Sequence, residues 1–284
     1  MTRRQFVSSL SLAGALPGYA FGLEPNWLEL TSQTVVLPCL APGVPIRILQ
    51  LSDLHLSSYV PFSLIDRAIS MGLNANPDLI CLTGDFITNS EPFDSGRYAT
   101  LLKRLSRRAP TFASLGNHDG GLWAARHIGG FSDNSAVRSL LEAADVHLLH
   151  NRSQLLSIRG RALYLAGVGD LWSQEAVPES AFASIPDNPD TPVVLLAHNP
   201  DTKELVANRP WHLMLSGHTH GGQVLIPVVG TRFVSVRDKR FISGLKKWNG
   251  KSIYITRGVG NLAGVRFNCR PEVTILDLAG PLLA

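Results

Sequence analysis

Apolar residues between positions 46 and 119 alternate between short continuous runs and helically spaced segments. The continuous runs lie in IRILQLSDLH, DLICLTGD and PTFASLGNHD, and each run ends in polar residues. Between them, residues 62–74 and 95–106 carry apolar residues at helical spacing. Continuous runs are typical of strands buried on both faces, and strands that alternate with helices predict right-handed βαβ units. We therefore expect a largely parallel sheet in the first half of the chain.

The second half has a different pattern, in which short strands dominate after one more predicted helix at residues 137–145. The predicted strands lie in VHLLH, RALYLAGVG, TPVVLLAHN, HLMLSGH, GQVLIP, SIYITRG and EVTILDL. Such a series favours a second, more mixed sheet. Nearer the N-terminus, WLELTSQTVVLP alternates loosely and predicts a strand or hairpin before a proline-rich connection. The whole pattern predicts an α/β fold in which two packed mixed β-sheets are flanked by helices.

The first residues indicate a targeting segment. MTRRQFVSSLSLAGALPGYAFG begins with Arg3 and Arg4, continues with a moderately apolar stretch, and places small residues at Gly18 and Ala20. This arrangement resembles a twin-arginine export signal that is cleaved after Ala20. A short N-terminal helix with two chance arginines, or an uncleaved membrane anchor, stays open as an alternative. We accordingly divide the chain into a signal peptide or anchor, an N-terminal strand with its linker, and the main domain, at residues 1–22, 23–45 and 46–284.

Composition narrows the expected partners. Hydrophobic residues make up 45% of the 284 residues, enough for a large core, and charged residues only 17%. The net charge is +4, of which Arg3 and Arg4 supply 2, and the remaining +2 is too weak to indicate a nucleic-acid partner. Cys39, Cys81 and Cys269 form no CxxC pair, which disfavours a zinc–thiolate site. We expect free cysteines, although a pair between Cys39 and Cys269 stays open.

Metal-ligand residue types follow five predicted strands. They are Asp53 and His55, then Asp85, then Asn117, His118 and Asp119, then His198, and finally His218 and His220. The carboxyl ends of strands in α/β sheets converge on one crevice, which is the usual ligand site. Oxygen and imidazole donors without thiolate suit Mn, Fe, Zn, Co or Ni. Solvated loops would explain any one of these residues but not all five positions together, so the sequence predicts a metal site.

The motifs DLH, GD, GNHD, a later His and GHTH, in this order, resemble the calcineurin-like metallophosphoesterases. The resemblance covers the chain from about Ile46 onward. GHTHGGQV, YITRGVG and RFNCRPEV are further similar to the exported phosphodiesterases of the YkuE/YaeI type, a branch close to enzymes that hydrolyse UDP-2,3-diacylglucosamine. The resemblance implies a four-layer αββα sandwich and metal-dependent phosphodiester hydrolysis. The alternatives are a UDP-2,3-diacylglucosamine pyrophosphatase-like hydrolase of a lipid precursor and a non-catalytic metal-binding protein, which is disfavoured because every expected ligand is present.

Two divalent transition-metal ions are implied by the same resemblance. One would be held by Asp53, His55, Asp85 and His220, and the other by Asp85, Asn117, His198 and His218. Asp85 would bridge both ions, and a metal-bound hydroxide would attack the phosphorus. The glycines at 217, 221 and 222 are expected to keep the turn open for the substrate phosphate.

His118 and Asp119 are the implied catalytic residues. His118 would protonate the leaving oxygen or donate a hydrogen bond to it. Asp119 would orient the His118 imidazole, with a cap on the following helix as an equally weighted alternative. Red-purple acid phosphatases place a tyrosine ligand where this chain has Thr88, so a tyrosinate–iron site is not expected.

Several other residues have ordinary explanations beside functional ones. His127, His147, His150 and His212 lie outside any ligand spacing and are expected at the surface or in the core. Three C-terminal arginines could bind a phosphate or form salt bridges, for instance Arg270 with Glu272; they are Arg257, Arg266 and Arg270. An apolar mouth to the site or plain packing would explain Leu122, Trp123 and Phe131.

The expected substrate is a phosphoester small molecule or a lipid-linked phosphate. The twin-arginine export machinery is an expected partner, peripheral membrane contact stays open, and no specific nucleic acid is expected. We expect export to the periplasm or cell envelope, with the cytoplasmic face of the inner membrane as the alternative location.

Overall fold

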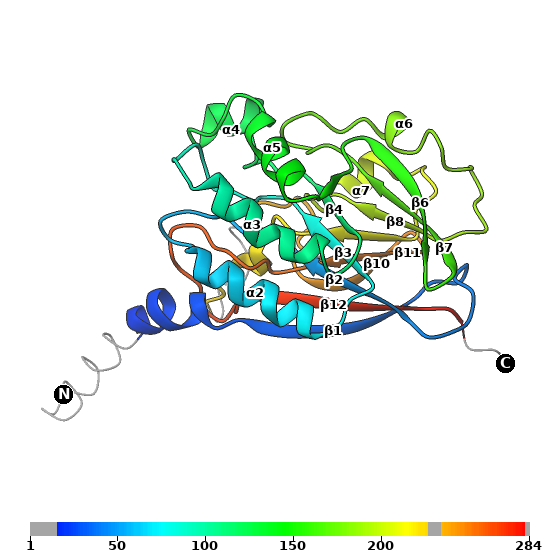
Figure 1. Ribbon diagram of the computed structural model, residues 1–284, viewed down its shortest axis with the longest axis horizontal. Helices are drawn as coiled ribbons and strands as arrows, with labels where there is room; N and C mark the ends of the chain where they lie inside the picture. Colours follow the sequence, from blue (N-terminus) through cyan, green and yellow to red (C-terminus); the bar gives the residue numbers. More distant parts are fainter. Residues whose placement is uncertain (1–15, 227–233, 282–284) are drawn as a thin grey trace, which may run out of the picture.

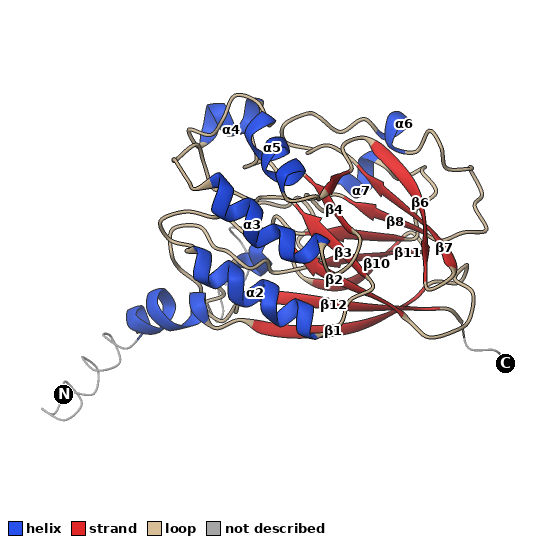
Figure 2. Cartoon of the chain, in the orientation of Figure 1, coloured by secondary structure: helices blue, strands red, loops and turns tan. Residues whose placement is uncertain are grey.

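Two six-stranded sheets packed face to face form the centre of the computed structural model, which describes residues 16–226 and 234–281 (Figure 1, Figure 2). In spatial order, the first sheet contains β1 (Glu29–Val36), β12 (Glu272–Ala279), β2 (Ile46–Leu51), β3 (Leu79–Thr83), β4 (Thr111–Ser114) and β5 (His147–Leu148). The second contains β10 (Gly244–Trp248), β11 (Lys251–Ile255), β9 (Leu213–Ser216), β8 (Val193–Leu196), β7 (Arg161–Gly167) and β6 (Arg152–Ile158).

Both sheets are mixed, as predicted. Strands β2, β3, β4 and β5 run parallel, whereas β12 is antiparallel to β2 and parallel to β1. In the second sheet β7, β8, β9 and β11 are parallel, and the edge strands β6 and β10 are antiparallel to their neighbours. The predicted α/β fold of two mixed sheets flanked by helices is therefore confirmed.

Three details of the predicted strand pattern are wrong. EVTILDL forms β12, which lies between β1 and β2, and VHLLH forms β5, which pairs with β4, so both lie in the first sheet instead of in the second. GQVLIP forms no strand over its described residues 222–226, where Val224 makes a single bridge to Phe267. The edge strands β6 and β10 were not predicted, because RSQLLSI and GLKKW carry the polar side chains that are typical of sheet edges.

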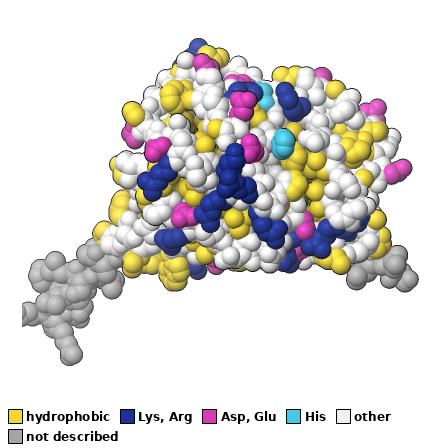
Figure 3. Space-filling view, in the orientation of Figure 1, with side chains coloured by type: hydrophobic (Ala, Val, Ile, Leu, Met, Phe, Trp, Pro, Cys, Tyr) yellow, Lys and Arg dark blue, Asp and Glu magenta, His cyan; other side chains and the backbone are white. Residues whose placement is uncertain are grey.

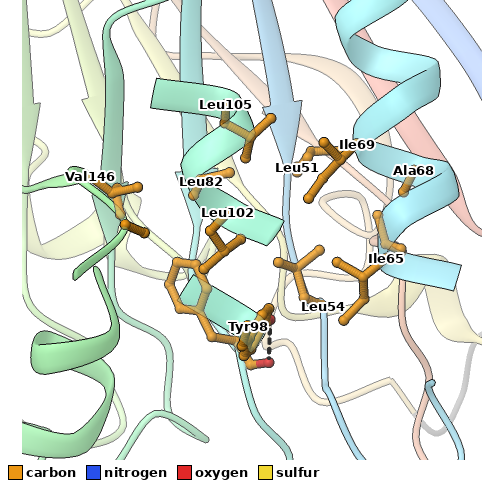
Figure 4. Close-up of a cluster of buried hydrophobic side chains, with 14 of the residues drawn as sticks. Leu51, Leu54, Ile65, Ala68, Ile69, Leu82, Tyr98, Leu102, Leu105 and Val146 are labelled. Carbon is orange, nitrogen blue, oxygen red and sulfur yellow. Dashed lines mark hydrogen bonds between the residues drawn. The ribbon is translucent and has the colours of Figure 1, made fainter. Parts of the chain in front are cut away.

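Three helices cover the outer face of the first sheet: α2 (Phe62–Asn74), α3 (Ser95–Ser106) and α5 (Ser135–Ala143) (Figure 1). The continuous apolar runs of the central strands arise because alternate residues pack toward opposite faces of the sheet. Ile80 packs toward the helices and Cys81 toward the second sheet, so each strand is buried on both faces. Figure 4 shows the helix side of this core, where Ile65 and Ile69 of α2 lie near Leu51 and Leu54.

The opposite outer layer is thinner, because the short helices α6 (Pro178–Ala181) and α7 (Thr202–Leu205) and adjoining loops cover the second sheet. Trp211 and Phe182 fill this side of the core. On the face of the molecule over α2 and α3, basic and acidic side chains are interspersed, which is typical of a solvated surface (Figure 3).

The described N-terminal segment packs against the end of the chain. It comprises η1 (Gly18–Leu23) and η2 (Glu24–Asn26). The Ala20 carbonyl accepts a hydrogen bond from the Arg266 amide at 2.9 Å, and the buried Glu24 carboxylate accepts from the amides of Asn268, at 2.9 Å, and Cys269. The expected cleavage point after Ala20 thus lies within η1, whereas Arg3 and Arg4 lie outside the described residues. Over the described ranges, no helix combines the length and apolar character needed to cross a membrane.

Candidate metal centre

Five strands deliver the predicted ligands to one buried crevice. Asp53 and His55 follow β2, Asp85 follows β3, Asn117 follows β4, His198 follows β8, and His218 and His220 follow β9. Each of the seven side chains is at most 8% exposed. The structure brings all seven together, because the two sheets stack so that the carboxyl ends of these strands face the same edge.

Asp53, His55 and His220 form the first group, with ligand atoms that all lie within 4.8 Å of one another. His220 Nε2 lies 3.1 Å from His55 Nε2 and 3.4 Å from Asp53 Oδ1. Asp85 Oδ2 lies 3.4 Å from His55 Nε2. Nitrogen and oxygen donors of three side chains thus face one point, which is the arrangement that a transition-metal ion requires.

Asp85 also belongs to a second group. Its Oδ2 atom lies 3.1 Å from His198 Nε2. His218 Nδ1 lies 2.9 Å from Asn117 Oδ1 and 3.3 Å from His198 Nε2. A single carboxylate oxygen therefore contacts a histidine of each group, so Asp85 joins them; ligand atoms of Asp53, Asp85 and His198 also lie within 4.8 Å of one another.

The outward nitrogens of the histidines are held by groups that the sequence did not single out. His198 Nδ1 lies 2.7 Å from the Thr83 carbonyl, and His218 Nε2 lies 3.2 Å from the Ser235 carbonyl. A carbonyl accepts only from an N–H, so these contacts assign the proton to the outer nitrogen and direct the other nitrogen's lone pair to the centre. His55 Nδ1 similarly contacts the Thr88 hydroxyl at 3.3 Å.

The electrostatics favour metal ligation. Burial lowers the pKa of His218 to about 3 and that of His118 to about 4, so both imidazoles are neutral at pH 7. Burial raises the pKa of Asp85, but the charges of His198 and His118 outweigh burial and hold it well below the ordinary value. Burial likewise lowers the pKa of His198, but the Asp85 carboxylate outweighs it and raises this pKa to about 10. Without metal, the neutral His218 therefore lies beside a charged His198 that is paired with the ionised Asp85, and His198 must lose its inner proton to become a ligand; the resulting set of imidazole and carboxylate donors fits a divalent metal.

Backbone strain accompanies this arrangement. Five ligand residues adopt left-handed conformations: Asp53 (φ 51°), His55 (φ 47°), Asp85 (φ 56°), His218 (φ 69°) and His220 (φ 51°). Residues other than glycine pay about 1–2 kcal/mol for this conformation. The surrounding sheet holds it through hydrogen bonds such as Asp53 N to the Gly84 carbonyl and His55 N to the Asp85 carbonyl, both 2.9 Å. Strain of this kind concentrates at functional sites.

Two glycines of GHTHGG, Gly217 and Gly221, serve packing within the protein, which corrects their expected role, whereas Gly222 lines a cavity together with His218 and His220. A Cβ on Gly217 would collide with Ser52 and Asp53, and a Cβ on Gly221 would press on Arg257 and Cys269. At these two positions glycine allows the histidine turn to lie against its neighbours, and no open space is left beside the Cα atom.

Asp119 has neither of its two expected roles. Its carboxylate accepts hydrogen bonds from the amides of Asp85, Phe86 and Gly116 at 2.7–2.8 Å, so it joins the loops that follow β3 and β4. The His118 imidazole is held instead by the Thr88 carbonyl, 2.6 Å from Nδ1. The following helix, α4 (Leu122–His127), begins after Gly121 with no side-chain cap.

The C-terminal arginines are held by the protein itself. Arg266 is fully buried and donates to the carbonyls of Arg257, at 2.8 Å, and Cys269, at 3.0 Å, while one terminal nitrogen lies 3.5 Å from His220 Nδ1. The expected pair between Arg270 and Glu272 is wrong. Arg257 contacts Glu272 at 3.3 Å, and Arg270 contacts Glu29 at 3.6 Å. Arg266 thus positions a ligand, a role that its place in RFNCRPEV did not reveal.

The remaining candidate residues either pack in the core or lie at the edge of the site. Phe131 packs against the helix-covered core, whereas Leu122 is 56% exposed. The Trp123 ring lies 5.3 Å from the His118 ring. His127 stacks on Trp123 outside the ligand cluster. Over the described residues the three cysteines are unpaired, as expected.

Comparisons with known proteins agree with this geometry. The calcineurin-like phosphoesterase family matches residues 46–222. Phosphodiesterase YaeI of Escherichia coli (strain K12) is 40% identical over 281 residues, covering 98% of this chain and 99% of the relative. The uncharacterized metallophosphoesterase YkuE of Bacillus subtilis (strain 168) is 32% identical over 292 residues, 98% of each chain. UDP-2,3-diacylglucosamine pyrophosphatase LpxG of Chlamydia muridarum is 28% identical over 305 residues, 91% of each chain. The chain therefore belongs to the calcineurin-like phosphoesterase family and is a phosphoric ester hydrolase.

Proposed function

We propose that the protein hydrolyses phosphodiesters with two divalent metal ions, held by the two ligand groups that share Asp85. The observation that carries this proposal is the position of Asp85 Oδ2, 3.4 Å from His55 Nε2 and 3.1 Å from His198 Nε2. Two ions, when bound, neutralise the phosphoryl oxygens and activate water for in-line attack. The identity of the ions follows the donor set, which suits Mn, Fe, Zn, Co or Ni.

His118 supplies the proton for the leaving oxygen in this proposal. Its Nδ1 carries a proton because it faces the Thr88 carbonyl at 2.6 Å, so Nε2 is the nitrogen that faces the substrate. Since burial keeps this imidazole neutral at pH 7, Nε2 must first take up a proton beside the anionic phosphodiester before it passes that proton to the leaving oxygen. The His118 ring lies 4.7 Å from the ring of His55, perpendicular to it, which puts it beside the ligands. The Thr88 contact fixes the orientation of the His118 ring, so the ring does not have to rotate before it transfers a proton.

The relatives support the phosphodiester as substrate class and leave a second candidate. YaeI is named a phosphodiesterase and aligns over nearly the whole chain, which favours a diester. LpxG is named a UDP-2,3-diacylglucosamine pyrophosphatase, which favours a nucleotide-sugar diphosphate with a lipid-like arm.

One activity screen decides between the two. Metal-loaded protein is assayed with a phosphodiester, a phosphomonoester and a nucleotide-sugar diphosphate at equal concentration, and Asp85→Ala serves as the inactive control. We expect the diester to have the highest kcat/KM. A higher value for the nucleotide-sugar diphosphate would favour the second candidate, and equal low rates in the wild type and Asp85→Ala would contradict both.

We further propose export by the twin-arginine route, with peripheral contact to the membrane through the N-terminal segment. The support is the pair Arg3 and Arg4 before a weakly apolar stretch. Replacing both arginines by lysine is expected to keep the protein in the cytoplasm, as measured by cell fractionation. Full-length wild-type protein found soluble in the cytoplasm would contradict export.

A further inference from the structure

Two tryptophans form an aromatic surface beside the metal centre, which we name the indole wall. Trp123 and Trp172 lie with ring centroids 5.2 Å apart. Trp172 packs its ring edge-on to His218 at 4.3 Å, and the Trp123 ring lies 5.3 Å from that of His118. The indole wall therefore touches one metal ligand and the residue assigned to the leaving oxygen.

A cavity of about 930 Å³ opens along the indole wall. Its apolar lining is completed by Leu171, Leu205, Val234 and Val236. Leu205 on α7 is 48% exposed although it is a large apolar side chain. A concave, apolar space of this volume is typical of sites that bind drug-sized molecules.

The charges in the cavity restrict its occupant. Asp201 and Glu204 line it from α7 and the residue before, and Arg237 lines it from the opposite segment. The Asp201 carboxylate also accepts from the Arg237 amide at 2.8 Å. The Lys203 ammonium lies 3.5 Å from the Asp201 carboxylate and 3.6 Å from that of Glu204, so the two carboxylates are balanced by Lys203 and Arg237. The lining thus offers no excess positive charge to a second phosphate, and its apolar side chains favour a neutral occupant over a nucleotide.

We propose that this cavity binds a planar apolar body of the leaving alcohol, which makes Trp172 and Leu205 specificity-determining residues. This inference rests on the proposed phosphodiesterase function. In-line displacement places the leaving oxygen next to His118, and the atoms attached to that oxygen must then continue onto the neighbouring indole wall. Planar rings stack on indole faces with an attraction beyond simple area burial, so an aromatic body fits better than an alkyl chain.

The test compares two diesters whose leaving aromatic groups differ in size: methyl 4-nitrophenyl phosphate and methyl 4-nitronaphthyl phosphate. Because the two leaving groups also differ in acidity, the naphthyl-to-phenyl ratio of kcat/KM in each variant is compared with the ratio in the wild type. Metal-loaded wild type is expected to have the higher kcat/KM on the naphthyl ester. Trp172→Ala should lower that kcat/KM by roughly ten- to hundredfold, mainly through KM, and the nitrophenyl value by only a few-fold, because less apolar area is lost. Trp172→Phe should restore most of the difference.

Two further variants separate recognition from structural damage. Leu205→Ala removes a cavity side chain away from the metal centre and should reduce the naphthyl preference at unchanged metal content. Trp27→Ala removes an indole that is 53% exposed and lies outside the cavity, so both kcat/KM values should stay unchanged. Binding of 1-naphthol, measured by equilibrium dialysis, should weaken in Trp172→Ala and not in Trp27→Ala.

The outcomes distinguish the proposed leaving-group site from the proposed phosphodiesterase activity on which it rests. If wild type hydrolyses both esters and Trp172→Ala and Leu205→Ala lower both rates by the same factor, the cavity is not a leaving-group site, while the phosphodiesterase proposal stands. If metal-loaded wild type hydrolyses neither ester, the phosphodiesterase proposal fails and the leaving-group assignment fails with it, even where 1-naphthol binds.

Discussion

Replacing Asp119 by asparagine would test how the loops of the metal centre are held. In the wild type, Oδ2 accepts from the amides of Asp85 and Gly116, both at 2.8 Å, and Oδ1 accepts from the Phe86 amide at 2.7 Å. An asparagine keeps the shape, but its NH₂ group can only donate. At least one of the three buried amides then faces another donor. Burial raises the pKa of Asp119 to about 7, so at a pH above this value the remaining bonds also lose the charge of the acceptor.

The magnitude follows from these contacts. A buried donor without an acceptor costs about 1–3 kcal/mol, and two bonds to a neutral instead of a charged acceptor lose about 1 kcal/mol each. We therefore expect Asp119→Asn to lower the free energy of unfolding by roughly 3–5 kcal/mol. With a urea slope of about 3 kcal/mol/M, the unfolding midpoint would fall by more than about 1 M. Metal affinity should fall as well, because the Asp85 backbone loses one of its anchors.

The assay is urea unfolding followed by circular dichroism, together with elemental analysis after metal loading. Asp94→Asn is the matched control, since the Asp94 carboxylate accepts a single exposed bond from the Arg97 amide at 2.9 Å, and its midpoint should change little. An unchanged midpoint in Asp119→Asn with full metal content and lost activity would refute this reasoning. That result would favour the role of orienting His118 that the sequence suggested.

Three further predictions concern the centre itself. Asp85→Ala should fall from close to two bound ions per chain to less than one, because Asp85 joins both ligand groups; elemental analysis that still finds two would contradict the bridge. His118→Asn should keep its metal and lose activity by about 10²–10⁴-fold, less on a nitrophenyl diester than on an alkyl diester, since nitrophenolate leaves without protonation. Metal uptake at pH 7 should release about one proton from His198, whose pKa is raised to about 10, and titration calorimetry in buffers of different ionisation enthalpy should find this release vanishing above pH 10. In the protein without metal, charged His198 contributes its full stabilisation of the folded state below about pH 6.5, and this contribution is lost as the pH rises through about 10.

The positions of the ligands could be predicted because they depend on a general rule. Parallel strands end at one edge of a sheet, so Asp53, Asp85 and His198 were expected together from the strand pattern alone. The contacts of Asp119 could not be predicted, since they depend on which amides two separate loops bring to one carboxylate. Arg266 was missed for a similar reason, because a guanidinium that donates to backbone carbonyls has the same sequence signal as one that binds a phosphate.

Strands that are buried on both faces could be predicted from the sequence, whereas strands that are buried on one face could not. β3 reads as a continuous apolar run because both faces are covered. The sequence of β10 is GLKKW, and its lysines are compatible with a sheet edge and equally with a loop. EVTILDL was placed in the wrong sheet because its apolar run shows that β12 is buried but not which neighbours bury it.

The pairing of β1 with β12 sets an order of events during synthesis. Along its whole length β1 pairs with β12, from Glu29 with Glu272 to Val36 with Ala279, and Ala20 and Glu24 find the partners described above at residues 266–269. At about 5–20 residues per second, roughly 10–50 s separate the synthesis of β1 from that of β12. During this interval, the strand next to the proposed export signal lacks its partner strand. The last ligand, His220, is made before that strand arrives, so a growing chain possesses every metal ligand before its N-terminal segment has a place in the fold.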